Sequence, residues 1–326
     1  MAIHRLAWLL SFALTSIGVA CGAAQDSPVF IQKLVYSNRN DAIAVMYSDI
    51  GEPYRTVYMQ IIAGVEDKTK SQISAYPVGG NTDSEMIKGN LRVQGAKVVI
   101  SLGWQSMKTA IGLDSGLGLV ISGVVDAPET ETRGFPVYSL SPDPALLFSR
   151  SKELMPSVRR IHTVYDPNKN QRFIDLAKRA ALNQGLELVA REAPDLRSAM
   201  DIYQEIFKSA SSRGEALWLL QDSTTVEDGS VLPMVLRESW DRNLAVFSSN
   251  PGHVRRGVLF SLYPDNVSLG RHLADTALKF LASGDYAERG TILLRDVQMA
   301  INLRTAQHLE LNIGSRQNFG MVFPEQ

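Results

Sequence analysis

Apolar runs rich in Val and Ile alternate with amphipathic stretches along most of this chain. The first such run covers residues 43–47, and a helical stretch follows from Arg55. Continuous apolar strands that alternate with helices are typical of a parallel sheet with helices on both faces. In the first half the pattern predicts strands at 43–47, 72–78, 97–102 and 118–123, with helices from Arg55 and near 83–93 and 105–111.

The segment 134–143, which reads GFPVYSLSPD, interrupts this rhythm with two prolines and several polar residues. The alternation then restarts, with predicted helices at 144–154, 171–184, 196–210, 232–240 and 267–281 and predicted strands at 161–165, 186–190, 216–220, 244–248 and 258–262. Two short strands at 291–294 and 298–302, predicted to pair, precede a short helix at 303–309. We therefore predict an α/β fold of two lobes, 28–140 and 141–264, with a ligand cleft between them.

Short polar and aromatic residues recur where the predicted strands end. In open parallel sheets, ligands bind at the carboxyl ends of the strands. Ser, Thr and Asn can hydrogen-bond a carboxylate or an amide, Asp can pair with an amino group, and Tyr54 or Trp104 can stack on a ligand. The alternative is that each of these residues only caps a helix or shapes a turn. The candidate ligand-binding residues are Ser48, Asp49, Tyr54, Gly103, Trp104, Gln105, Asp126, Asp166, Asp222, Ser223, Thr224, Ser249 and Asn250.

Catalytic and metal-binding motifs are not found in the sequence. It contains no GxSxG elbow, no HExxH motif and no P-loop, and its five histidines lack metal-ligand spacing. We therefore expect a protein that is not an enzyme and has neither a cofactor nor a metal. The formal net charge of −1 gives no basic excess of the kind that DNA binding needs, so a nucleic-acid partner is not expected.

The N-terminus has the three regions of a secretory signal. His4 and Arg5 precede an apolar stretch at 6–19, and small residues follow it. We predict a signal peptide at 1–24 and a periplasmic protein. Three outcomes stay open: cleavage after Ala24, a lipid on Cys21, or an uncleaved anchor. Cys21 is the only cysteine, so the folded part has no internal disulfide, and a lipid on Cys21 is the one membrane attachment we expect of a processed chain.

Several longer motifs resemble one family. They are VVISLGWQSMKTA, VVDAP, VYDPNKNQ, LLQDSTTVED, VLFSLYPDNVSLGRHLADTALKFLASG and VQMAINLRTAQHLEL. Over roughly residues 42–311 the chain resembles the substrate-binding proteins of ABC transporters, in the group related to tryptophan/tyrosine-binding proteins. Two departures are the insertion of Ala127 between Asp126 and Pro128, and Trp104 where relatives often have a small polar residue.

The resemblance implies a periplasmic-binding-protein type I fold, with three crossovers between two lobes and a return of about 265–326 to the first lobe. It also favours Asp222 as the partner of a ligand's amino group. It implies a protein that captures a small molecule, an amino acid or a related organic solute, and delivers it to an ABC permease. The alternative is a periplasmic sensory subunit that presents its ligand to a signalling receptor.

Overall fold

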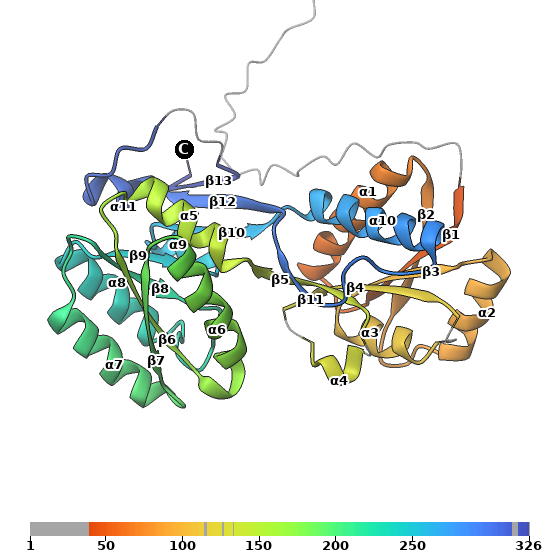
Figure 1. The fold of residues 1–326 in the computed structure, drawn as a ribbon, viewed down its shortest axis with the longest axis horizontal. Helices are drawn as coiled ribbons and strands as arrows, with labels where there is room; N and C mark the ends of the chain where they lie inside the picture. The colour runs from red at the N-terminus through yellow and green to blue at the C-terminus, as the bar shows by residue number, and fades with distance from the viewer. Residues whose placement is uncertain (1–38, 114–115, 126, 133, 315–318, 326) are drawn as a thin grey trace, which may run out of the picture. The chain divides into compact units, whose positions relative to one another are not determined.

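The computed structural model describes residues 39–113, 116–125, 127–132, 134–314 and 319–325. The predicted signal peptide, Cys21 and Asp126 lie outside the described residues. The described residues form two α/β sheets, both of which belong to one compact unit (Figure 1). None of the described helices is long and apolar enough to span a membrane.

The first sheet is parallel throughout. Its described strands follow the order β11-β5-β4-β3-β1-β2, and in β1 Val45 lies between Ala75 of β2 and Ile100 of β3. Their bounds are β1 (Arg39–Ser48), β2 (Gln72–Val78), β3 (Val98–Leu102), β4 (Gly118–Val124), β5 (Pro136–Pro142) and β11 (Gly290–Leu294).

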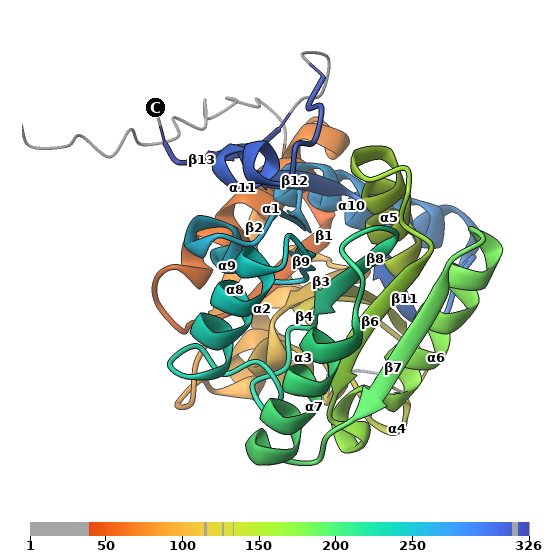
Figure 2. The same cartoon turned by 90° about the vertical axis from the view of Figure 1, so that its left-hand side faces the viewer.

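The second sheet is parallel except where β12 pairs with β10. Its described strands follow the order β13-β12-β10-β9-β8-β6-β7. Their bounds are β6 (Arg160–Tyr165), β7 (Glu187–Glu192), β8 (Glu215–Leu219), β9 (Ala245–Ser248), β10 (Phe260–Pro264), β12 (Val297–Asn302) and β13 (Met321–Phe323). Figure 2 shows β8, β6 and β7 next to one another, with helix α6 beside β7.

Helices cover both faces of each sheet, as the sequence predicted. Successive residues of β1 point to opposite faces, so Val45 packs with α1 and α10 while Met46 packs with α2 and α3. The helices are α1 (Tyr54–Thr69), α2 (Ser84–Gln94), α3 (Trp104–Ile111), α4 (Glu129–Thr132), α5 (Pro144–Leu154), α6 (Pro167–Asn183), α7 (Leu196–Ser209), α8 (Val231–Asp241), α9 (Gly252–Arg256), α10 (Asn266–Ser283) and α11 (Leu303–His308).

Helices α1 and α10 lie side by side although about 200 residues separate them in the sequence (Figure 1). Gly64 and Gly270 meet at their crossing, where a Cβ atom on Gly64 would lie 2.1 Å from the carbonyl oxygen of Val267. Only glycine allows so close an approach of the two backbones. This crossing fixes α10 on the first sheet.

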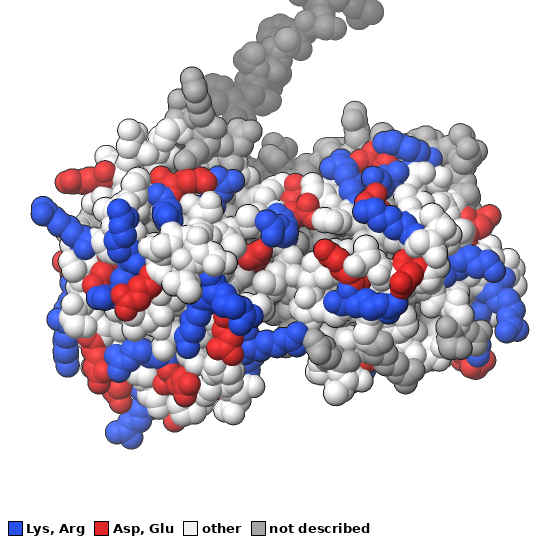
Figure 3. Space-filling model, viewed as in Figure 1, with Lys and Arg blue, Asp and Glu red and all other residues white. Residues whose placement is uncertain are grey.

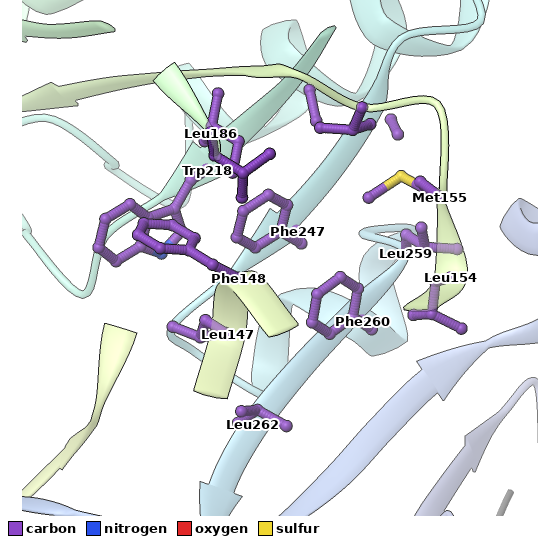
Figure 4. Close-up of a cluster of buried hydrophobic side chains, with 14 of the residues drawn as sticks. Leu147, Phe148, Leu154, Met155, Leu186, Trp218, Phe247, Leu259, Phe260 and Leu262 are labelled. Atoms are coloured by element: carbon purple, nitrogen blue, oxygen red, sulfur yellow. The ribbon is translucent and has the colours of Figure 1, made fainter. Parts of the chain in front are cut away.

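An aromatic cluster fills one face of the second sheet (Figure 4). The rings of Trp218 and Phe148 meet edge to face at 5.4 Å, and Phe247 stacks on Phe260 at 5.1 Å. Such ring pairs contribute beyond the area that they bury. These packed rings therefore support the strands from one face and hold their carboxyl ends in place.

The segment 134–143 is a strand rather than a break, which corrects the prediction. It forms β5, between β4 and β11. Its two prolines are the first and last residues of the strand, Pro136 and Pro142. At these positions the missing N–H groups interrupt the ladder least, so the prolines do not prevent strand formation.

The two predicted strands at 291–294 and 298–302 do not pair with each other, because they join different sheets. β11 joins the first sheet beside β5, whereas β12 joins the second sheet beside β10, with Arg295 and Asp296 between them. The return to the first sheet therefore ends with β11, and β12, α11 and β13 lie with the second sheet. Two short apolar runs separated by three residues are typical of a hairpin. Local pattern does not specify which sheet each strand joins.

Three segments cross between the sheets, and hydrogen bonds connect them. The N–H of Asp143 donates to the carbonyl of Leu294 at 2.9 Å, and the N–H of Asp265 donates to the carbonyl of Asp296 at 2.9 Å. Arg295 also pairs with the Asp143 carboxylate at 3.2 Å. The three crossovers thus form one connected strip.

Candidate functional site

A cavity of about 440 Å³ lies at the carboxyl ends of strands from both sheets, and we call it the strand-end cavity. The first sheet lines it with Val125 after β4, with the end of β5 and with β11. The second sheet lines it with Leu220 and Gln221 after β8 and with Ser249 after β9. Of the twelve expected site residues that the structure describes, only Ser249 lines this cavity.

Helix α6 supplies the charged wall of the strand-end cavity. Lys169, Arg172, Leu176 and Arg179 follow the three- and four-residue spacing of one helix face, and all line the cavity. The helix begins four residues earlier than predicted, because Asp166 caps it and Pro167 occupies its first turn. These basic residues were not among those expected at the site, although their three- and four-residue spacing was a usable signal.

Uncharged polar groups complete the lining. The hydroxyl of Ser139 is fixed, since it donates to the carbonyl of Val125 and accepts from the N–H of Ser141 at 2.9 Å. The side chains of Ser141, Gln221 and Thr291 make no hydrogen bond with another described residue. They are therefore available to a bound molecule.

Two buried carboxylates, Asp166 and Asp222, hold the second-sheet side of the site together. One oxygen of Asp222 accepts from the N–H of Asp166 and from the side-chain amide of Asn170, each at 2.9 Å, and the other accepts from the N–H of Thr224 at 2.9 Å. Asn170 itself lines the strand-end cavity. Asp222 thus fixes the position of a lining amide, while its role toward a ligand's amino group stays a prediction.

Asp166 is part of the same network. Burial alone would raise the pKa of Asp166, but hydrogen bonds from the Asn168 N–H and the Thr224 hydroxyl, together with the Lys169 charge, lower that pKa below its ordinary value. The carboxylate is therefore ionised at neutral pH. This arrangement is the capping function that the sequence analysis gave as the alternative.

A second hollow of about 390 Å³, which we call the acidic hollow, shares Leu220 and Gln221 with the strand-end cavity. Three expected residues line it, namely Asp222, Ser223 and Asn250. Asp228 and Glu227 add further carboxylates. No group of three or more His, Cys, Asp or Glu side chains in the described part of the chain is arranged to hold a metal ion.

His253 lines the acidic hollow and is almost fully buried. Its Nδ1 lies 2.9 Å from the Ser248 hydroxyl, and its Nε2 lies 3.2 Å from the side-chain amide of Asn250. Burial lowers the pKa of His253, against the opposing effect of nearby Asp228. The imidazole is therefore neutral at pH 7 and holds the loop after β9 in place.

The edge of the first sheet differs, because it exposes large apolar side chains. Ile50, Tyr54, Trp104 and Val125 are 47%, 55%, 40% and 46% exposed. They follow the ends of β1, β3 and β4, which are neighbours in the sheet, and we call them the apolar edge. Asp49 and Gln105 are exposed beside them. Only Val125 of this set lines the strand-end cavity.

Beneath the apolar edge the backbone is tightly held. The buried hydroxyl of Ser48 accepts from the N–H of Ser106 at 3.1 Å. Gly103 has a φ of +89°, and a Cβ atom there would lie 2.4 Å from the Tyr58 hydroxyl and 2.6 Å from that of Ser48. This glycine lets α3 begin directly at Trp104, so the indole is presented from a rigid position.

Comparison with known proteins agrees with this architecture. A sequence search of curated proteins found no match. Among solved structures, the ligand-free, open form of a substrate-binding protein with adhesive properties from Clostridium difficile has a TM-score of 0.63 at 15% identity, with 86% of this chain and 98% of that chain covered. An ABC domain in complex with L-Trp from Streptococcus pneumoniae has a TM-score of 0.52 at 16% identity, with 87% and 100% covered.

A periplasmic ribose ABC transporter structure from Conexibacter woesei is also similar, with a TM-score of 0.51, 13% identity and coverage of 84% of this chain and 94% of that chain. At these identities the similarity shows the fold alone, and it confirms the predicted two-lobed binding-protein architecture. The profile of the ABC transporter substrate-binding proteins, a family of non-enzymatic and typically extracytoplasmic proteins, matches residues 148–317. This match spans more than half of the sequence, and the chain therefore belongs to the ABC transporter substrate-binding protein family.

Proposed function

We propose that this protein captures an amino acid or a related small organic solute in the strand-end cavity and delivers it to an ABC permease. The observation that carries the proposal is the cavity itself, since strands of both sheets line it. Its volume of about 440 Å³ lies within the range of small-molecule sites. A ligand there touches both sheets, so its binding favours arrangements in which both sets of contacts form.

The charges around the site support a ligand that carries groups of both signs. Three cations of α6, among them Lys169 and Arg179, line the strand-end cavity together with one carboxylate, Asp175, whereas Asp228 and Glu227 line the acidic hollow next to it. A carboxylate pairs well with the first set and an ammonium group with the second. An amino acid has both groups at short separation. The L-Trp bound in the Streptococcus pneumoniae structure gives further support to this ligand class.

Transport is favoured over the sensory alternative because the matching family is defined by its association with ABC transporters. For this role we infer export to the periplasm, through the segment 1–24 or with a lipid on Cys21. Mass spectrometry of the protein isolated from its own cells tests the inference. A mature N-terminus at Gln25 or a lipidated Cys21 supports export, and an intact Met1 on a cytoplasmic protein contradicts it.

A thermal-shift screen of amino acids and small organic acids tests the ligand class. A binder at a hundredfold excess over its Kd raises the apparent free energy of unfolding by about 2.7 kcal/mol. For the best binder, Arg179→Gln is expected to weaken affinity by about 1–2 kcal/mol, because a charged hydrogen bond is lost. Lys178→Gln is the matched control, since Lys178 is exposed on the same helix but does not line the cavity. Equal effects of the two substitutions would place the ligand elsewhere.

A further inference from the structure

A second cavity, of about 410 Å³, lies at the opposite end of the second sheet and shares no lining residue with the strand-end cavity or the acidic hollow. Leu244 and Gly257, which precede β9 and β10, line it, as do the last turn of α8 and helix α11. We call it the arginine cavity, after the residues described below. It has no part in the function proposed above.

An aromatic pair forms one wall of the arginine cavity. The rings of Trp240 and His308 are stacked at 3.6 Å with an angle of 5° between their planes. The Nε2–H of His308 donates to the main-chain carbonyl of Trp240 at 3.0 Å, so the pair is held rigidly. Trp240 remains 38% exposed, and Leu244, Val246 and Leu309 continue the apolar lining. A preorganised aromatic wall of this kind loses little entropy when a second ring packs on it.

Four arginines and one carboxylate line the same cavity, namely Arg237, Arg255, Arg256, Arg304 and Asp241. On the face of the molecule drawn in Figure 3, positive and negative side chains are intermixed. The excess of cations around this cavity therefore differs from the general charge pattern of that face. The lining therefore has a formal charge of about +3, which favours an anion.

Arg256 is held by Asp228, since it donates to the main-chain carbonyl at 2.7 Å and pairs with the carboxylate at 3.3 Å, but the other three arginines are bound only loosely. Arg237 and Arg255 make exposed ion pairs at 3.5 Å, with Glu238 and Glu325. Exposed pairs at this distance contribute little and exchange easily. The Arg304 guanidinium lies 5.6 Å from the centre of the Trp240 ring and makes no ion pair with any described residue. It is the cation best placed to meet an anion beside the indole.

The buried polar side chains of the lining are already satisfied. Asn302 donates to the carbonyl of Val254 at 2.8 Å, and the Thr305 hydroxyl donates to that of Gly257 at 2.8 Å. Recognition in this cavity consequently depends on the aromatic wall and the guanidinium groups.

We propose that the arginine cavity is a second ligand site, which binds a small aromatic carboxylate. The ring packs against Trp240, and the carboxylate pairs with Arg304. The volume of the cavity fits a small molecule rather than a folded partner. The pairing of a planar guanidinium with a carboxylate is the strongest hydrogen-bonded contact that such a site can offer.

Fluorine NMR of protein labelled with 5-fluorotryptophan tests the proposal with benzoate as the probe. Three of the four tryptophans are described: Trp104, Trp218 and Trp240 lie respectively at the apolar edge, in the core and in the arginine cavity, so each of these three places has its own resonance. Trp240→Phe assigns the signal of interest. Benzoate is expected to move the Trp240 resonance saturably and to leave that of Trp218 in place. Benzamide, the neutral analogue, should have no effect at the same concentration.

Three substitutions test whether the Arg304 cation contributes to benzoate binding. Arg304→Gln should raise the half-saturating benzoate concentration roughly fivefold, and Arg304→Lys should restore part of the loss. Arg150→Gln makes the same charge change at an exposed position of α5 outside the cavity and should leave the titration unchanged. Arg304 is exposed, so the folded spectrum should persist in each variant. The proposal is overturned if benzoate moves only Trp104, if benzamide acts equally, or if Arg304→Gln behaves like Arg150→Gln.

Discussion

The two sheets end in very different edges, although the strands that form them follow the same pattern. The edge of the first sheet exposes Tyr54 and Trp104 above a tightly packed backbone. The edge of the second sheet buries Asp166 and Asp222, whose oxygens accept hydrogen bonds from the loops around them. Position in the fold therefore does not determine chemistry. One edge leaves apolar surface open to a partner, whereas the other uses most of its polar groups to hold itself together.

Breaking the packing under the first edge should have the largest effect. Gly103→Ala forces a positive φ on alanine and places its Cβ atom against Tyr58 and Ser48. We expect the free energy of unfolding, measured by urea titration, to fall by about 3 kcal/mol or more. Gly79→Ala is the control, because a Cβ atom there meets only ordinary contacts at 3.9 Å, and its effect should stay within about 0.5 kcal/mol. Equal stabilities of the two variants would contradict the tight packing.

Asp222→Asn should disrupt the hydrogen-bond network at the edge of the second sheet. The substitution replaces one accepting oxygen with a donor, so at least one of the buried groups that Asp222 serves loses its acceptor. A loss of about 2 kcal/mol in the free energy of unfolding is expected. Ser223→Ala, at the exposed neighbour, should change it by less than about 0.5 kcal/mol. Unchanged stability combined with weaker ligand binding would instead support the direct pairing of Asp222 with a ligand's amino group.

Trp104→Ala tests whether the apolar edge of the first sheet binds the ligand. Trp104 is 40% exposed, and the Lys108 ammonium lies over its ring, 5.1 Å from the centre. The free energy of unfolding should therefore fall by less than about 1 kcal/mol. If the apolar edge contacts the ligand, affinity for the best binder of the thermal-shift screen should weaken by about 1–3 kcal/mol, measured by calorimetry. Unchanged affinity would mean that the edge serves another partner.

The smallest expected effect concerns pH and the second edge. Burial lowers the pKa of His253 from its ordinary value of 6.5, so below that value the unfolded chain binds more protons than the folded one. The neutral His253 imidazole therefore makes its full contribution to the free energy of unfolding above pH 6.5. This contribution is lost as pH falls toward the folded pKa. Unfolding midpoints at pH 7.5 and 5.5 should therefore differ less in His253→Gln than in the original protein. An identical difference in both proteins would exclude His253 as its source.

Much of the local structure follows from the sequence. The predicted strand at 72–78 and the helix at 144–154 coincide with β2 and α5, because the period of apolar residues directly reflects which face of an element is buried. The family resemblance likewise depends on local motifs, most of which join a strand to the helix that follows it. The fold class and the family could thus be predicted from one sequence.

The tertiary structure decided how these elements combine. β11 and β12 have similar apolar patterns yet belong to different sheets, because strand pairing depends on contacts far apart in the sequence. It also decided that Asp222 fixes Asn170 and that the cations of α6 line the strand-end cavity. A sequence shows which groups can form hydrogen bonds, but whether each group is satisfied within the protein or left for a ligand depends on the neighbours that folding brings to it.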